Sequence, residues 1–161
     1  VKMAVQRAEA DAESREHHFN LDLEPELPMI FSDAKRISQA LSHVLNNAIK
    51  YTPDKGTITV SVTLENKDEK ESAFIEIAVQ DTGIGIAPED REQVFDKFYR
   101  AGDADLHSTG HIKFKGAGPG LGLSIAKGII ERLNGRIWLE SQGYDEVNCP
   151  GCLFHIQLPV T

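Results

Sequence analysis

The stretch 116-GAGPGLGLSIAKGII-130 decides how the rest of this chain is interpreted. Its glycines at positions 116, 118, 120 and 122 suit neither a strand nor a helix interior, because glycine adds backbone entropy and no packing side chain. The apolar residues that follow recur at helical spacing. We therefore predict a loop that leads into a helix N-terminus, where free amides and the helix dipole favour an anion such as phosphate. A mobile glycine hinge without a ligand is the alternative.

Length and composition indicate one domain over residues 1–161, long enough to bury a core. The chain has 17 Lys and Arg against 25 Asp and Glu, a net charge of −8. No strongly basic surface stands out, so neither nucleic acid nor direct membrane contact is expected. No apolar run approaches the roughly 20 residues of a membrane span, and no signal peptide is visible. We expect a cytoplasmic segment of a longer protein, because it begins at Val1 inside a predicted helix; membrane anchorage of that protein stays open.

Hydrophobic periodicity predicts the secondary structure. Asp33 is placed to cap a helix, Pro88 to open a short one, and Asn134-Gly135 to end one with a left-handed cap. Helices are predicted over residues 1–16, 34–52 and 121–133, and strands over residues 19–23, 29–31, 57–65, 75–81, 137–139 and 153–158.

Three polar residues line one flank of the predicted helix over residues 34–52. His43, Asn47 and Lys50 stand at positions i, i+4 and i+7, and Tyr51 follows at the end of the helix. An imidazole, an amide and an ammonium group beside an apolar seam could hold a metal ion and a phosphate chain. A solvated helix face is the alternative.

Asp81 follows Ile75, Ile77 and Val79 at the same two-residue spacing, so it is expected on the same buried face of the strand. A carboxylate on a buried face is costly unless a partner bonds to it, and the glycines of Thr82-Gly83-Ile84-Gly85-Ile86 let a ligand approach the backbone. The parity favours a ligand. An Asp that accepts hydrogen bonds from its own turn amides is the alternative.

Two further segments carry patterns of their own. Val94, Phe95, Phe98 and Tyr99 are apolar at helical spacing and predict a core patch. Residues 100–115 are polar without a period, and a loop of this length in a small domain is more often a functional lid than filler.

Cys149 and Cys152 form a C-x-x-C sequence around Pro150-Gly151. No helix N-terminus lowers a thiol pKa there and no second cysteine pair completes a zinc site, so a turn with two reduced cysteines is favoured over a redox switch.

Four segments, in order, resemble the boxes of the ATP-binding catalytic domain of sensor histidine kinases, a branch of the superfamily that includes gyrase-type, mismatch-repair and heat-shock ATPases. The resemblance covers nearly the whole chain. Residues 43–52 resemble the N box, residues 81–86 the first glycine box, residues 94–100 the F box and residues 118–123 the second glycine box.

The resemblance implies an α+β fold of the Bergerat type, a two-layer α/β sandwich in which three helices cover one face of a mixed sheet of about five strands. It also implies ATP and Mg²⁺ as cofactors, with Asn47, Lys50 and His43 as catalytic candidates. Asn47 would bind the metal, Lys50 the phosphates and Tyr51 the adenine or ribose. Asp81 would accept a hydrogen bond from the adenine amino group. The remaining nucleotide contacts would come from Gly83, Gly85, Ile86, Gly118, Gly120, Leu121, Gly122 and Leu123, with Phe95 and Phe98 anchoring the lid.

The function implied is transfer of the γ-phosphoryl group of MgATP to a histidine. That histidine would lie on the protein's own dimerisation and phosphoacceptor helices, absent here, and a response regulator would be the next partner. None of the histidines of this chain lies in a phosphoacceptor box, so the fragment should not phosphorylate itself. A nucleotide-binding pseudokinase module is the alternative. A self-contained ATPase would need a catalytic glutamate on the Asn47 flank, and none is present.

Two positions depart from the family pattern. His43 replaces the first asparagine of the N box, so either the outer shell of the metal differs or a neutral imidazole takes the place of an amide. Activation of water by His43 is not expected, because a kinase gains by not hydrolysing ATP. Pro119 stands where Thr or Ser is common, which stiffens the loop and removes one amide donor. ATP binding should survive, whereas lid mobility is in doubt.

Overall fold

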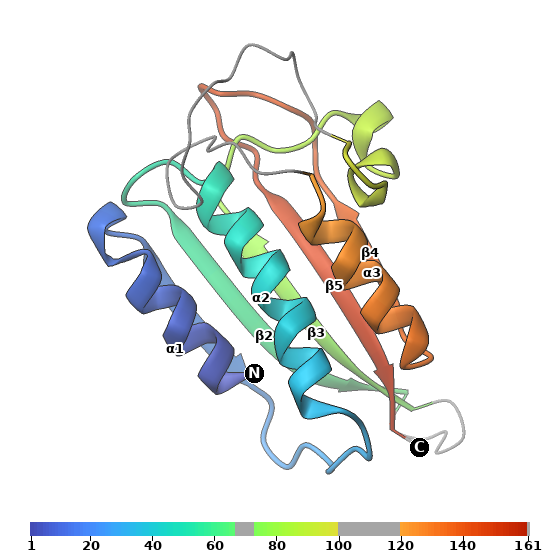
Figure 1. Cartoon of the computed structure of the whole chain (residues 1–161). Helices are drawn as coiled ribbons and strands as arrows, with labels where there is room; N and C mark the ends of the chain where they lie inside the picture. Colours follow the sequence, from blue (N-terminus) through green and yellow to red (C-terminus); the bar gives the residue numbers. More distant parts are fainter. Residues whose placement is uncertain (67–72, 100–119, 161) are drawn as a thin grey trace.

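The computed structural model describes residues 1–66, 73–99 and 120–160. Within these residues three α-helices cover one face of a five-stranded sheet (Figure 1). The helices are α1 (Lys2–Asp11), α2 (Ala34–Tyr51) and α3 (Gly122–Arg132). The strands are β1 (His18–Leu23), β2 (Thr57–Glu65), β3 (Phe74–Asp81), β4 (Arg136–Glu140) and β5 (Cys152–Pro159). Short 3-10 helices are η1 (Glu13–Arg15), η2 (Pro88–Asp90) and η3 (Gln93–Phe95).

The sheet is mixed, with strand order β1-β2-β3-β5-β4. β1 pairs with β2 in parallel, and the pairs β2–β3, β3–β5 and β4–β5 are antiparallel. The predicted two-layer α+β sandwich with helices on one face is therefore confirmed.

The core lies between the sheet and the helices. Alternate residues of the strands point to opposite faces, so one apolar set from each strand meets the apolar stripes of the helices. The fully buried side chains include Leu41, Val44 and Leu45 of α2, Val60 of β2, Val79 of β3, Ile130 of α3 and Phe154 and Ile156 of β5.

Several predicted helix boundaries are confirmed by their capping contacts. Asp33 Oδ1 accepts hydrogen bonds from the amides of Lys35 and Arg36, both at 3.0 Å, and so caps α2. Asn134 adopts φ +58° after α3, in the left-handed region expected of a cap. Pro88 begins η2, which is a single 3-10 turn.

One predicted element is wrong and another is only partly correct. Residues 29–31 form no strand, and Met29 and Phe31 are 97% and 102% exposed, because this segment passes from β1 to α2 without a neighbouring strand. The core patch predicted from Val94, Phe95, Phe98 and Tyr99 is only partly correct: Phe95 is buried and Val94 packs against the core, but helical structure stops with η3. Phe98 is 70% exposed with φ +64°, which ends any helix there.

One end of the molecule gathers the segments of interest. The C-terminal ends of α2 and β3, the N-terminal end of α3 and the β4–β5 connection lie there together (Figure 1). Among the helices that the structure describes, none has the length and hydropathy of a membrane span.

Candidate functional site

The polar flank of α2 is present as predicted. His43, Asn47 and Lys50 are half-buried, whereas Val44 and Ala48 on the neighbouring stripe are buried in the core. The Nζ atom of Lys50 lies 5.0 Å from the centre of the Tyr51 ring, within the range of a cation–π contact. The flank therefore presents its imidazole, amide and ammonium groups at the border of the core.

Asp81 ends β3 on the buried face, as its parity predicts, and it is only 5% exposed. Its Oδ1 atom accepts hydrogen bonds from the amide of Gly83 at 2.8 Å and from the amide of Cys152 at 3.2 Å. The alternative, in which Asp81 accepts a hydrogen bond from a backbone amide of its own turn, is therefore present at Gly83, but the backbone amides occupy only the Oδ1 atom. No hydrogen bond to Oδ2 is found among the residues that the structure describes, so that oxygen is available as an acceptor.

Burial raises the pKa of Asp81 to about 6, and the two amide bonds oppose this rise. The carboxylate is therefore mostly ionised above pH 7. Burial also lowers the pKa of His43, so its imidazole is neutral at neutral pH.

The first glycine segment, residues 81–86 of the first glycine box, packs against the end of α2. A Cβ atom on Gly83 would lie 2.6 Å from the carbonyl oxygen of Tyr51, closer than real Cβ contacts. The amide of Ile84 donates to that same oxygen at 3.1 Å. Gly83 is thus required by the approach of two protein segments, whatever it offers a ligand.

The β4–β5 connection supports the other side of this glycine segment, a role that sequence reasoning missed. Gly85 has φ +74°, and a Cβ there would lie 1.9 Å from the carbonyl oxygen of Gly143. Gly151 was the available signal, because it has φ +77° and a Cβ there would lie 2.1 Å from the carbonyl oxygen of Asp81. Three hydrogen bonds join the two segments: Gly151 N to Gly83 O (2.8 Å), Asp145 N to Ile84 O (2.8 Å) and Ile86 N to Ser141 Oγ (3.0 Å).

The start of α3 contacts both α2 and the F segment, which is the described part of the F box over residues 94–99. The amide of Phe98 donates to the carbonyl of Gly120 at 2.9 Å. A Cβ on Gly122 would lie 3.4 Å from Nδ1 of His43, so Gly122 and His43 are neighbours. Leu121 precedes the first turn of α3 and provides no side-chain cap, which leaves amides there for another acceptor.

The F-segment phenylalanines differ from each other. Phe95 is buried and meets Phe154 edge-on, with ring centres 6.5 Å apart, whereas Phe98 points away from the core and is exposed. Gly118, Pro119 and the predicted lid over residues 100–115 lie outside the described residues.

The flank of α2 connects the first glycine segment with the second, which is the described part of the second glycine box over residues 120–123. His43 contacts Gly122, and Tyr51 contacts Gly83; these two contact points are separated by roughly 12 Å along the helix at 1.5 Å per residue. Asn47 and Lys50 lie between them. The structure thus places the predicted flank between Gly122, at the start of α3, and Gly83, which follows Asp81 by two residues.

Both cysteines are free. Cys152 is buried, and burial together with the nearby Asp81 carboxylate raises the pKa of its thiol to about 12. Cys149 is half-buried, and its Sγ contacts the carbonyl of Glu146 at 3.5 Å. These contacts fit the predicted turn with reduced thiols.

Known proteins similar to this chain include sensor kinases. The chain is 35% identical to the adaptive-response sensory kinase SasA of Trichormus variabilis over 86% of its own length, and it spans 30% of that protein. The mycobacterial sensor histidine kinase MprB has a similar structure, with a TM-score of 0.72 over 98% of this chain and 93% of that chain at 24% identity.

A second similar structure is full-length ShkA in complex with AMPPNP, with a TM-score of 0.74 over 98% of this chain and 28% of that chain at 22% identity. Residues 32–161 match the model of one protein family. The chain belongs to that family, the histidine kinase-, DNA gyrase B- and HSP90-like ATPases.

Proposed function

We propose that this chain is the ATP-binding catalytic domain of a two-component sensor histidine kinase. It would transfer the γ-phosphoryl group of MgATP to a histidine on a dimerisation domain outside this chain. The observation that carries the proposal is the α2 flank, which contacts the second glycine segment at His43 and the first at Tyr51. Family membership and the sensory kinases among the relatives support it.

The adenine end of the site would be built around Asp81. Its Oδ1 is occupied by two backbone amides, which hold the carboxylate in one orientation. Its Oδ2 would then accept a hydrogen bond from the amino group of the base. Tyr51, whose backbone carbonyl binds the first glycine segment, would pack on the adenine or ribose. Gly85 and Ile86 would line this end. A buried acceptor with a fixed direction selects for a base with an amino group. A base with a carbonyl at that position would leave its own oxygen and Oδ2 of Asp81 without a hydrogen-bond donor.

The phosphate end would use the opposite part of the flank. Lys50 and the uncapped amides at the start of α3 would neutralise the triphosphate, with Gly118, Gly120 and Gly122 allowing close backbone approach. Leu121 and Leu123 would fill the space behind the loop, and Phe95 and Phe98 would anchor the lid.

Asn47 is the residue that would hold Mg²⁺. No group of three or more His, Cys, Asp or Glu side chains in residues 1–66, 73–99 and 120–160 could bind a metal ion. A single amide oxygen fits Mg²⁺, which usually keeps waters and phosphate oxygens as its other ligands. When bound, the ion would screen the charge of the phosphates. The neutral imidazole of His43 would contact the ion's outer shell rather than act as a base.

The proposed reaction breaks the bond between the γ-phosphorus and the bridging oxygen to the β-phosphate and forms a phosphorus–nitrogen bond to the acceptor imidazole. ADP leaves with the bridging oxygen, and the imidazole N–H proton goes to solvent. Positioning and charge stabilisation supply most of the rate in such transfers. This chain would therefore contribute nucleotide binding and alignment. The dimerisation helices would contribute the acceptor, and a response regulator would receive the phosphoryl group.

Two measurements test the proposal. Titration with MgAMPPNP should show binding that Asp81→Asn weakens strongly and that Asp22→Asn, at an exposed position of β1, leaves unchanged. Labelled ATP should give no stable label on the chain alone and a labelled histidine when the parent protein's dimerisation helices are added. Stable label on the chain alone would contradict the proposed division of labour. Binding without transfer to any added acceptor would identify a pseudokinase module instead.

A further inference from the structure

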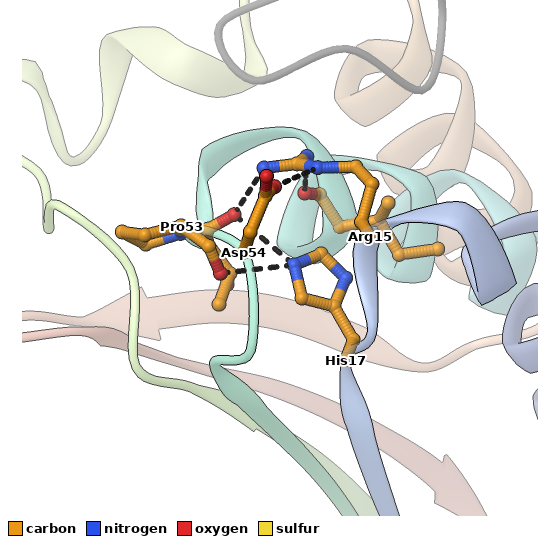
Figure 2. Close-up of polar contacts among 6 residues, drawn as sticks. Arg15, His17, Pro53 and Asp54 are labelled. Carbon is orange, nitrogen blue, oxygen red and sulfur yellow. Dashed lines mark hydrogen bonds and ion pairs between the residues drawn. The ribbon is translucent and has the colours of Figure 1, made fainter.

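A buried arginine lies at the C-terminal end of α2, outside the segments that sequence reasoning selected. Arg15 ends η1, between α1 and β1, and is only 7% exposed. Figure 2 shows its guanidinium group facing the end of α2. Its Nη1 donates to the carbonyl of Ile49 and its Nη2 to the carbonyl of Thr52, both at 2.7 Å. Its Nε donates to Oδ1 of Asp54 at 2.7 Å.

The chemistry of a helix end explains this arrangement. The last carbonyls of a helix have no partner within the helix, and α2 ends at Tyr51, where Thr52 is the C-cap residue and Pro53 rather than glycine follows. A cation there is favoured by the helix dipole, and the planar guanidinium presents several N–H groups in fixed directions. Burial of this charge is costly, so it requires the carboxylate of Asp54 as well as the carbonyls.

A second side chain completes the cap. His17 Nε2 lies 3.2 Å from the carbonyl oxygen of Thr52 and 3.1 Å from that of Pro53, and donates to both (Figure 2). Burial and the neighbouring charge of Arg15 lower the pKa of His17, so the ring is neutral at neutral pH. The end of α2 is thus held by two side chains from the connection between α1 and β1.

The two carbonyls that Arg15 binds flank two residues of the proposed nucleotide site. Ile49 directly precedes Lys50, and Thr52 directly follows Tyr51. The intervening carbonyl of Tyr51 is bound by the amide of Ile84. One rigid guanidinium therefore sets the backbone on both sides of Lys50 and Tyr51, and with it the direction in which both side chains leave the helix.

We propose that Arg15 is a positioning residue for nucleotide binding. It acts through Lys50 and Tyr51, and it makes the affinity for nucleotide depend on the connection between α1 and β1. The inference rests on the proposed function, because it assigns Arg15 to the same site. A structural cap alone would change stability and leave the phosphate contacts of Lys50 unaffected.

The test is a double-mutant cycle of Arg15→Met and Lys50→Met, with MgAMPPNP as the probe at a temperature where circular dichroism shows every variant folded. Arg15→Met should raise the dissociation constant about tenfold in the wild-type background and less than about threefold in the Lys50→Met background, since coupled residues are not additive. Equal fold-changes in both backgrounds would overturn the proposal.

Two controls separate positioning from stability. Arg132→Met removes an exposed arginine from the last turn of α3, and Val5→Ala trims a buried α1 side chain; each should change affinity less than about twofold. If Val5→Ala lowers the unfolding midpoint as much as Arg15→Met does and also weakens binding as much, the proposal is wrong. If Arg15→Met does not fold, Arg15→Lys replaces it. The dissociation constant for MgAMPPNP should then rise about threefold, because a lysine cannot bond both carbonyls in the same geometry. Wild-type affinity in that variant would also overturn the proposal.

Failure of the proposed function has a different result. The nucleotide site itself is refuted if the wild-type protein does not bind MgAMPPNP, or if Asp81→Asn binds it with the same affinity as the wild type. Asp81-dependent binding that is insensitive to Arg15 refutes only the positioning role.

Discussion

The backbone amide of Phe98 donates a hydrogen bond to the carbonyl oxygen of Gly120 over 2.9 Å. Both residues have left-handed backbone conformations, with φ +64° at Phe98 and φ +68° at Gly120. The F segment and the start of α3 are therefore joined directly, although residues 100–119 separate them along the chain. The conformation of one constrains the other. A side chain at Gly120 would be poorly tolerated, because its Cβ would meet the backbone of both Phe98 and Tyr99.

Gly120→Ala should weaken nucleotide binding. A Cβ there would lie 2.8 Å from the carbonyl oxygen of Tyr99, and a left-handed alanine costs about 1 to 2 kcal/mol. We expect MgAMPPNP to bind roughly tenfold more weakly, because the amides at the start of α3 are displaced. Titration calorimetry measures this, and far-ultraviolet circular dichroism should remain that of the wild type. Unchanged affinity would show that the start of α3 does not contact the nucleotide.

Gly128→Ala should stabilise the protein and leave nucleotide binding unchanged. Gly128 is inside α3, and no atom lies within 4 Å of the position of its missing Cβ. Alanine favours a helix interior by about 1 kcal/mol over glycine, so the free energy of unfolding should rise by about that amount. Urea unfolding checks this. A loss of stability would indicate that the outer face of α3 is covered by a part of the protein not described here.

Asp81→Asn should alter the pH dependence of stability. The folded-state pKa is about 6, above the unfolded value of 3.8, so the folded state binds more protons between these values. The free energy of unfolding should therefore fall as the pH rises from 4 to 7, by on the order of 2 to 3 kcal/mol from this group. Asp81→Asn should lack this contribution. Urea unfolding of both proteins at pH 4 and pH 7 measures the difference.

The histidines do not confuse this comparison. The pKa values of His17 and His43 are lowered in the folded state, so their contribution to stability rises with pH, the opposite direction. Both residues are present in both proteins, and their contributions cancel in the difference. An equal pH dependence in wild type and variant would mean that Asp81 is more solvated than its burial indicates.

Alkylation should distinguish the two cysteines. The thiol of Cys152 is buried and its pKa is raised to about 12, whereas Cys149 is half-buried. Because the thiolate is the reactive form, iodoacetamide at pH 8 should label Cys149 in the folded protein and both residues in urea. Peptide mass spectrometry locates the label. Rapid labelling of Cys152 in the folded protein would show that the Asp81 end of the sheet opens readily.

Local patterns predicted much of the fold. The alternation in residues 57–65 and 75–81 identified both strands and the face that each buries, and with it the burial of Asp81. Asp33 and Asn134 marked helix ends because their capping contacts involve only nearby residues. The four boxes identified the family, and their residues are the candidate site.

The failures have one physical origin. The apolar residues 29–31 looked like a strand, but a strand needs a partner, and the partner is not a property of the segment itself. Phe98 followed a helical period, yet its bond to Gly120 turns the chain outward. In each case the presence or absence of a partner distant in sequence decided the local structure.

The sequence by itself determined which residues are apolar, in what period, and which carry the chemistry of a nucleotide site. Only the tertiary structure decided what holds those residues in place: the β4–β5 connection behind the first glycine segment and the guanidinium of Arg15 at the end of α2. The reason is that the carbonyls at a helix end can accept hydrogen bonds from, and the amides of a loop can donate them to, any suitable partner that the fold brings near. Periodicity reports which face of an element is buried, but not which distant side chain completes its hydrogen bonds.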